Sequence, residues 1–241
     1  MRKSSDFKLY CFLSVRCFMF IIVFILGSTL LNKKLPEISK WWSVIVSILN
    51  ILTILMLLRY CKSKKISYAM LINYRKGQTK AKSVVWTIFL FLLLGMGGMY
   101  IAGFLCYGEL PYLPAMMIQP IPIILAIINC MLLPLTTTLA EDGLYLGIGI
   151  NSIQNTKARV LIPAFFFAIQ HSFIPTLFDF QYVLYRFLSF LPLTIVICYL
   201  YRKKCNPVPI MAGHFVINIA TVVQIVMTFL LYTSPSPRDC S

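Results

Sequence analysis

Seven long apolar runs restrict what this chain can fold into. They cover approximately residues 11–31, 42–58, 84–107, 115–139, 160–178, 182–201 and 208–232. Most are close to the length of about 20 residues that an α-helix needs to cross the hydrocarbon core of a bilayer. Only 12% of the 241 residues are charged, whereas a soluble domain carries about 25%. Because the runs also lack strand-like alternation, we predict an all-α, polytopic transmembrane bundle of about seven spans.

Basic residues between these runs predict the topology. The formal net charge is +15, which in a soluble protein would indicate a nucleic-acid partner. Here Lys and Arg flank the apolar runs, where they set orientation and meet lipid headgroups. The segment 59–83 carries eight of them and no acid. We therefore predict a multi-pass protein of the cell membrane whose N-terminus is cytoplasmic, with membrane lipids rather than nucleic acid as partners. Segments 59–83, 141–159 and 202–207 would lie on the cytoplasmic side.

The chain reads as one integral membrane domain over residues 1–232. The first run follows basic residues, as in a signal peptide, but it is long and lacks a clear cleavage site, so we interpret it as a retained span. The tail 233–241, TSPSPRDCS, differs in composition from the rest, and we interpret it as disordered or as a cloning artefact. None of the eight Cys forms a CxxC pair, which gives no support to a zinc ribbon or a redox motif.

Isolated polar residues in the later runs are the candidate functional residues. The two His of the chain, His171 and His214, both lie within apolar runs. Asn218 follows His214 by four residues and therefore shares its helix face. An ionisable group at membrane depth costs about 2.5–3.5 kcal/mol or more unless it faces partners or a cavity. Glu141 and Asp142 come where the fourth run ends, which we interpret as the cytoplasmic mouth of a cavity.

Each of these residues also has a structural interpretation. The two acids could be solvated near a helix N-terminus, and His171 could bond a neighbouring carbonyl. His214 and Asn218 could form a pair that holds two helices together. However, His171, His214 and Asn218 fall about 9–16 Å into spans that start from the same face, at 1.5 Å per residue. This agreement in depth favours one shared site.

A carboxylate beside imidazoles suits amide hydrolysis. The carboxylate can act as a general base on water, while a second imidazole and an amide hold a carbonyl oxygen as it becomes an oxyanion. The same set, Glu141, His171 and His214, could instead bind a divalent metal such as zinc. The sequence contains no HExxH motif, which would favour the metal, and it leaves both alternatives open.

Three short motifs in this region resemble those of the CAAX protease and bacteriocin-processing (CPBP) family of intramembrane peptidases. Phe167–His171 matches the FxxxH element and His214–Asn218 matches the HxxxN element. The EExxxR element is represented by Glu141-Asp-Gly-Leu-Tyr-Leu146, in which Asp142 replaces the second Glu and Leu146 replaces Arg. The resemblance covers about residues 115–232.

The resemblance implies an α-helical membrane endopeptidase whose site opens toward the cytoplasm. Its substrate would be a small peptide or a prenylated or otherwise lipidated protein. By position, the resemblance assigns water activation to Glu141, assistance to His171 and the oxyanion site to His214 with Asn218. Asp142 and Phe167 would be supporting residues.

Two other functions are consistent with the sequence. The altered first motif leaves room for a non-catalytic membrane protein of the same fold, acting in bacteriocin self-immunity or as a scaffold. A proton-coupled transporter would rest only on the buried His and Glu, and the chain shows no paired halves of the kind that inverted repeats leave.

Overall fold

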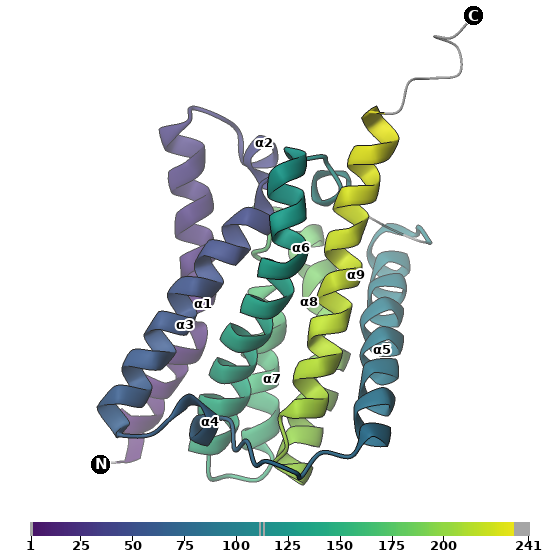
Figure 1. Cartoon of the computed structure of the whole chain (residues 1–241). Coiled ribbons are helices and arrows are strands. Elements are labelled where there is room, and N and C mark those ends of the chain that lie inside the picture. Colours follow the sequence, from purple (N-terminus) through teal and green to yellow (C-terminus); the bar gives the residue numbers. More distant parts are fainter. Residues whose placement is uncertain (1, 111, 113, 234–241) are drawn as a thin grey trace, which may run out of the picture.

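Long helices account for most of the described chain. The structure, a computed structural model, describes residues 2–110, 112 and 114–233, and the side chains of residues 7–110, 112 and 114–227. The long helices are α1 (Arg2–Leu30), α3 (Trp42–Lys64), α5 (Ala81–Tyr107), the continuous pair α6 (Ile123–Thr137) and η2 (Thr138–Ile150), α8 (Phe180–Lys204) and α9 (Val208–Thr233) (Figure 1). The shorter elements are α2 (Leu35–Ser39), α4 (Tyr68–Leu71), η1 (Ala115–Met117) and α7 (Ala158–Gln170).

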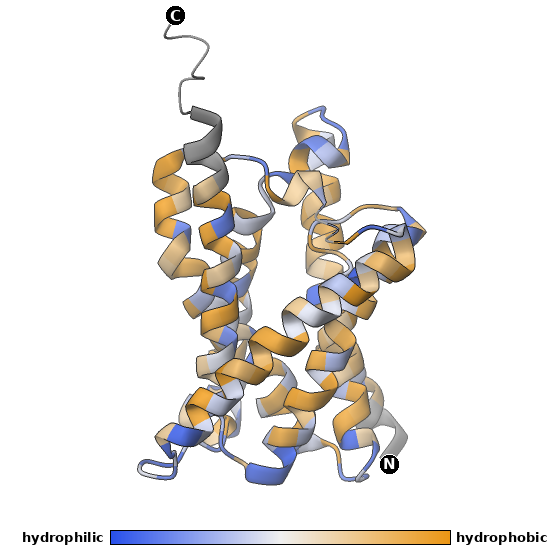
Figure 2. Ribbon diagram, turned by 90° about the vertical axis from the view of Figure 1, so that its right-hand side faces the viewer, coloured by the Kyte–Doolittle hydropathy of each residue, from blue (hydrophilic) through white to orange (hydrophobic). Residues whose placement is uncertain are grey.

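The predicted all-α membrane bundle is confirmed. Six helices in the described residues are long and apolar enough to cross a membrane, and α7 is a shorter apolar helix. The ribbon is largely hydrophobic along the middle of the helices, while hydrophilic residues gather in the loops at the two ends of the bundle (Figure 2). The predicted tail begins at the last residue of α9, and residues 234–241 lie outside the described residues.

The fourth span differs from its predicted limits of 115–139 at both ends. Its helix begins only at Ile123, after Pro122, because a proline lacks the N–H and is accommodated best at a helix start. Pro120 and Pro122 therefore precede the helix instead of kinking it, and only Pro134 lies inside. The helix then continues to Ile150 as η2, a π-helical segment. The predicted polar loop 141–159 is thus wrong over its first ten residues.

The fifth span is also shorter than predicted. The expected run 160–178 is helical only to Gln170, because Pro175 cannot continue a helix and disfavours helical geometry in the residue before it. At 1.5 Å per residue, α7 is about 20 Å long, less than the roughly 30 Å of a hydrocarbon core. Ser172, just beyond its end, is fully buried. The helix therefore ends inside the bundle, with His171 at its last turn.

The segment η2 is the centre of the bundle. It contacts α1, α3, α4, α6, α7, α8 and α9, and all residues from Ala140 to Ile150 are buried. The short helix α4 covers it at the end where the basic segment 59–83 lies. There the Tyr68 hydroxyl donates to the Leu139 carbonyl at 2.6 Å, and a Cβ on Gly143 would lie 2.8 Å from that hydroxyl oxygen. Close packing therefore closes this end of the bundle beneath η2.

Helix α5 packs closely on α8 and α9 through two of its glycines, Gly98 and Gly95. A Cβ on Gly98 would overlap the backbone carbonyl of Ser189, and one on Gly95 would overlap the Ile217 side chain. Gly97 faces open space. Small residues of this kind let two helix backbones approach.

We expect Gly98→Ala to destabilise the bundle and Gly97→Ala, its matched control, to leave it unchanged. The Ser189 backbone of α8 cannot move aside as a flexible side chain can, so the loss of stability should be about 1–3 kcal/mol. Thermal unfolding in detergent can be followed by the exposure of the buried thiols of Cys17, Cys61 and Cys198. Equal stability of the two variants would contradict the close contact between α5 and α8.

Candidate active site

A buried ion pair between α1 and η2 lies at the centre of the candidate site. Arg16 Nη2 donates to Glu141 Oε1 at 2.9 Å, and both side chains are 1% exposed. Three further acceptors complete the guanidinium environment: Gln170 Oε1 at 2.6 Å from Nε, Thr53 Oγ1 at 2.9 Å from Nη1, and Asn50 Oδ1 at 2.9 Å from Nη2. These bonds join α1 to α3, α7 and η2, and they fix the first oxygen of the Glu141 carboxylate.

Arg16 was missed by the sequence analysis. The same reasoning that selected the two His applies to it, because it is a lone cation inside the first apolar run. A charge at this depth requires a partner of opposite sign, but the sequence does not say which one. The first motif places its arginine at the position that Leu146 occupies, so it gives no indication of Arg16.

The second oxygen of Glu141 faces both imidazoles. Glu141 Oε2 lies 3.5 Å from His214 Nε2 and 3.9 Å from His171 Nε2. It makes no hydrogen bond to any described protein group. A buried carboxylate oxygen without a donor is costly, so this atom is positioned to receive a hydrogen bond from a water or a substrate. The predicted place of Glu141, at a solvated mouth, is wrong, because the side chain lies deep among helices.

The Nδ1 atom of each His residue makes a hydrogen bond to an acceptor other than Glu141. His171 Nδ1 bonds the Phe167 carbonyl at 2.8 Å, and His214 Nδ1 bonds Asp142 Oδ1 at 3.1 Å. A carbonyl or a carboxylate oxygen only accepts, so both Nδ1 atoms carry the hydrogen in these bonds. The bonds fix the orientation of both rings and leave each Nε2 directed toward Glu141.

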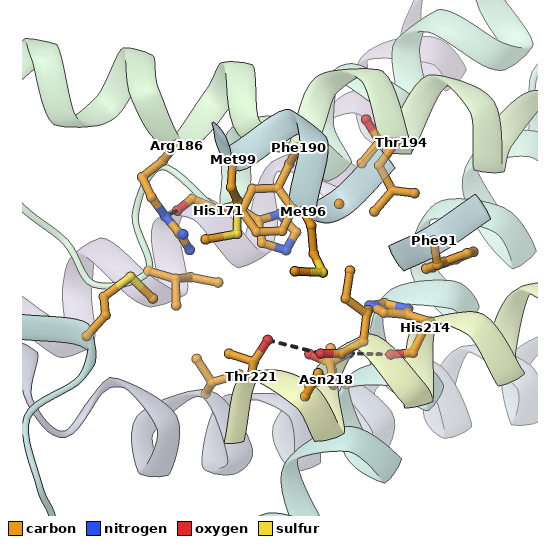
Figure 3. A pocket seen from close by; sticks show the side chains of 18 of the residues that line it. Phe91, Met96, Met99, His171, Arg186, Phe190, Thr194, His214, Asn218 and Thr221 are labelled. Atoms are coloured by element: carbon orange, nitrogen blue, oxygen red, sulfur yellow. Dashed lines mark hydrogen bonds between the residues drawn. The ribbon is translucent and has the colours of Figure 1, made fainter. Parts of the chain in front are cut away.

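The remaining predicted residues lie around this centre. Asp142 is fully buried and orients His214. The Phe167 ring lies 5.8 Å from the His214 ring and 6.0 Å from the His171 ring, centroid to centroid. Asn218 donates to the His214 carbonyl at 2.9 Å and lines the same cavity (Figure 3). The structure thus brings Glu141 and both His residues together, with Asn218 one turn along the cavity wall.

The site opens into a largely apolar cavity of about 240 Å³. Its lining reaches from Glu141, His171 and His214 to Tyr112 and Met117 in the connection between α5 and α6. This connection lies at the end of the bundle opposite α4 (Figure 1). The lining residues that are exposed on the molecular surface all belong to α5 and α9, namely Met96, Tyr100, Ala220 and Gln224. The exposed rim of the cavity therefore lies between these two helices.

The predicted metal ligands Glu141, His171 and His214 fit a metal poorly. Within the described part of the chain, no three His, Cys, Asp or Glu side chains form a group that could hold a metal ion. In addition, the Arg16 guanidinium already neutralises the Glu141 carboxylate. We therefore assign no step of the chemistry to a metal, and metal dependence stays a prediction for experiment.

Comparison with known protein families gives a match over the part of the chain that contains the predicted site residues. A family model described as type II CAAX prenyl endopeptidase Rce1-like matches residues 121–220. Neither the curated proteins nor the solved structures gave a significant match. The matched range contains every predicted site residue, from Glu141 to Asn218, whereas Arg16 lies outside it. Residues 121–220 thus match the Rce1-like type II CAAX prenyl endopeptidases, a group within the CPBP family of membrane peptidases.

Proposed function

We propose that this chain is an intramembrane endopeptidase in which Glu141 activates a water for attack on a peptide bond. The single observation that carries the proposal is the position of Glu141 Oε2. This oxygen is buried, has no hydrogen-bond partner in the described residues and lies within 3.9 Å of two imidazole Nε2 atoms at the wall of a cavity. A base held in this way can take a proton from water without reorganising.

The proposed steps follow from the donors and acceptors around this oxygen. Glu141 takes a proton from water as the hydroxide attacks the scissile carbonyl carbon, and His171 Nε2 helps to orient that water. The carbonyl oxygen becomes an oxyanion that His214 and Asn218 stabilise. Asn218 keeps a second amide hydrogen for this task. Glu141 then returns its proton to the leaving amine as the C–N bond breaks.

The cavity supports a substrate that carries a lipid or other apolar group. Its lining is largely apolar, and its exposed rim lies on α5 and α9, where a bilayer would surround the bundle. Entry from the membrane suits a small hydrophobic peptide or a prenylated protein, and the second agrees with the family description of a prenyl endopeptidase. The rim counts against the predicted opening toward the basic, cytoplasmic end, which α4 closes.

The basic residues still support the predicted orientation. The described N-terminal end of α1 lies at the same end of the bundle as α4 and the segment 59–83 (Figure 1). The positive-inside tendency places that end in the cytoplasm. We propose a multi-pass protein of the cell membrane in which residues 1–232 form one domain.

Replacement of Glu141 tests catalysis directly. We expect Glu141→Gln to lower the rate of cleavage of a farnesylated fluorogenic peptide at least about 100-fold, because the amide cannot accept a proton from water. Glu37→Gln, at an acid of the short helix α2, is the control. Cleavage at the wild-type rate by Glu141→Gln would contradict the proposal. Absence of cleavage by the wild-type protein itself would instead favour the non-catalytic alternative, a membrane protein of this fold in self-immunity or scaffolding.

Replacement of Arg16 tests the ion pair. Arg16→Met leaves the Glu141 charge buried without a partner and should cost roughly 3–5 kcal/mol in stability. The double variant Arg16→Met with Glu141→Gln removes both charges, so we expect it to recover much of the stability but none of the activity. Thermal unfolding in detergent measures the first effect and peptide cleavage the second. If Arg16→Met alone were as stable as the wild type, the pair would not be the constraint inferred here.

Chelation tests the metal alternative. Because the described residues provide no group of three metal ligands, we expect cleavage to persist after dialysis against a strong zinc chelator. Loss of activity that returns on addition of Zn²⁺, but not of Mg²⁺, would assign Glu141, His171 and His214 to a metal.

A further inference from the structure

A second buried arginine, Arg186 of α8, lacks the partners that Arg16 has. Its side chain is 3% exposed, and it lies inside the sixth apolar run of the sequence. The ion pairs in the described residues join Arg16, His171 and His214 to Glu141 or Asp142, and none involves Arg186. A buried cation without an anion is costly. The position therefore calls for a negatively charged group that the described residues do not supply.

The guanidinium uses only one of its five donors within the described protein. Arg186 Nε donates to the His171 carbonyl at 3.2 Å, and the Cζ atom lies 4.9 Å from the centre of the Phe190 ring. The two Nη groups make no hydrogen bond to described residues. They are also not among the fully enclosed unpaired atoms, so they reach free space. Figure 3 shows the guanidinium directed into the cavity beside His171 and Phe190.

Arg186 is close to the proposed catalytic centre. The same His171 whose carbonyl it contacts has its Nε2 atom 3.9 Å from Glu141 Oε2. Phe190 stacks on the His171 ring at 3.8 Å between centroids and also lies under the guanidinium. A ligand held by the Nη groups would therefore share one cavity with a peptide bond placed at Glu141.

We propose that Arg186 binds the free C-terminal carboxylate of the peptide substrate. A planar guanidinium with two free Nη groups matches a carboxylate in a bidentate arrangement, and the bond is strong where water is excluded. The proposal rests on the proposed function and deepens it, because it assigns recognition of the substrate's free C-terminus to Arg186, a residue outside the predicted site. A lipid phosphate presents the same chemistry to Arg186 but would leave the substrate terminus unrecognised.

The binding of two matched peptides tests this assignment. The first is a farnesylated, N-terminally labelled peptide with a free carboxylate, and the second is identical but ends in a carboxamide. We expect the carboxylate peptide to bind the Glu141→Gln protein about 10- to 100-fold more tightly. This measurement needs no catalysis, so its result is separate from the failure or success of the proposed function. Equal affinity for the two peptides, or no binding of either, overturns the proposal, and equal affinity is what a bound lipid phosphate predicts.

Variants at Arg186 separate recognition from packing. Arg186→Gln should abolish the preference for the carboxylate peptide, and Arg186→Lys should retain part of it, because one charge remains without the planar fork. Arg202→Gln, in the last turn of the same helix, should keep the full preference. A purely structural role would reduce the binding of both peptides equally and leave their ratio unchanged, which would also overturn the proposal. If Arg186→Gln does not fold, the comparison of the two peptides on the Glu141→Gln protein decides alone.

Discussion

The pairing of Arg16 with Glu141 is the interaction on which the rest of the site depends. Burying either charge alone would cost several kcal/mol, so the first and fourth spanning helices are tied together wherever the pair forms. Because Asn50, Thr53 and Gln170 share the same guanidinium, the pair also orders α3 and α7. Its chemical effect is asymmetric: it fixes one oxygen of the carboxylate and leaves the other available.

The same asymmetry appears in the two imidazoles. In each ring Nδ1 donates to an acceptor, the Phe167 carbonyl or Asp142, and Nε2 is directed toward Glu141. The protein thus supplies orientation from one side and leaves reactive atoms on the other, as pre-organised catalytic groups require. Arg186 follows a similar pattern, with one donor used for the protein and the Nη groups directed into the cavity.

The surrounding membrane strengthens the interactions of these polar groups. In lipid the walls of the bundle exclude water, so hydrogen bonds and charges inside the cavity act in a medium of low dielectric constant. In the proposed function, the cavity rim on α5 and α9 would place the hydrophobic part of a substrate against lipid while its polar backbone reaches Glu141. This division suits the description of the family model that matches residues 121–220, a prenyl endopeptidase.

Hydrophobic run length and polar residues inside those runs could be read without a structure. They predicted the helical bundle, approximate spans and the set Glu141, His171, His214 and Asn218, because transfer into lipid penalises each residue individually. The limits of the fourth and fifth spans were predicted less well. The acids in η2 looked like a solvated loop because the sequence does not display the partners that allow them to be buried.

The amino-acid sequence by itself determined which residues must find partners or a cavity. Only the tertiary structure decided which partner each one found. Arg16 and Glu141 are separated by 125 positions along the chain, and no local pattern encodes that pairing. Arg186, equally isolated in the sequence, was left with its Nη groups facing a cavity. The physical reason is that desolvation is a property of single residues, whereas its compensation is a property of how helices pack.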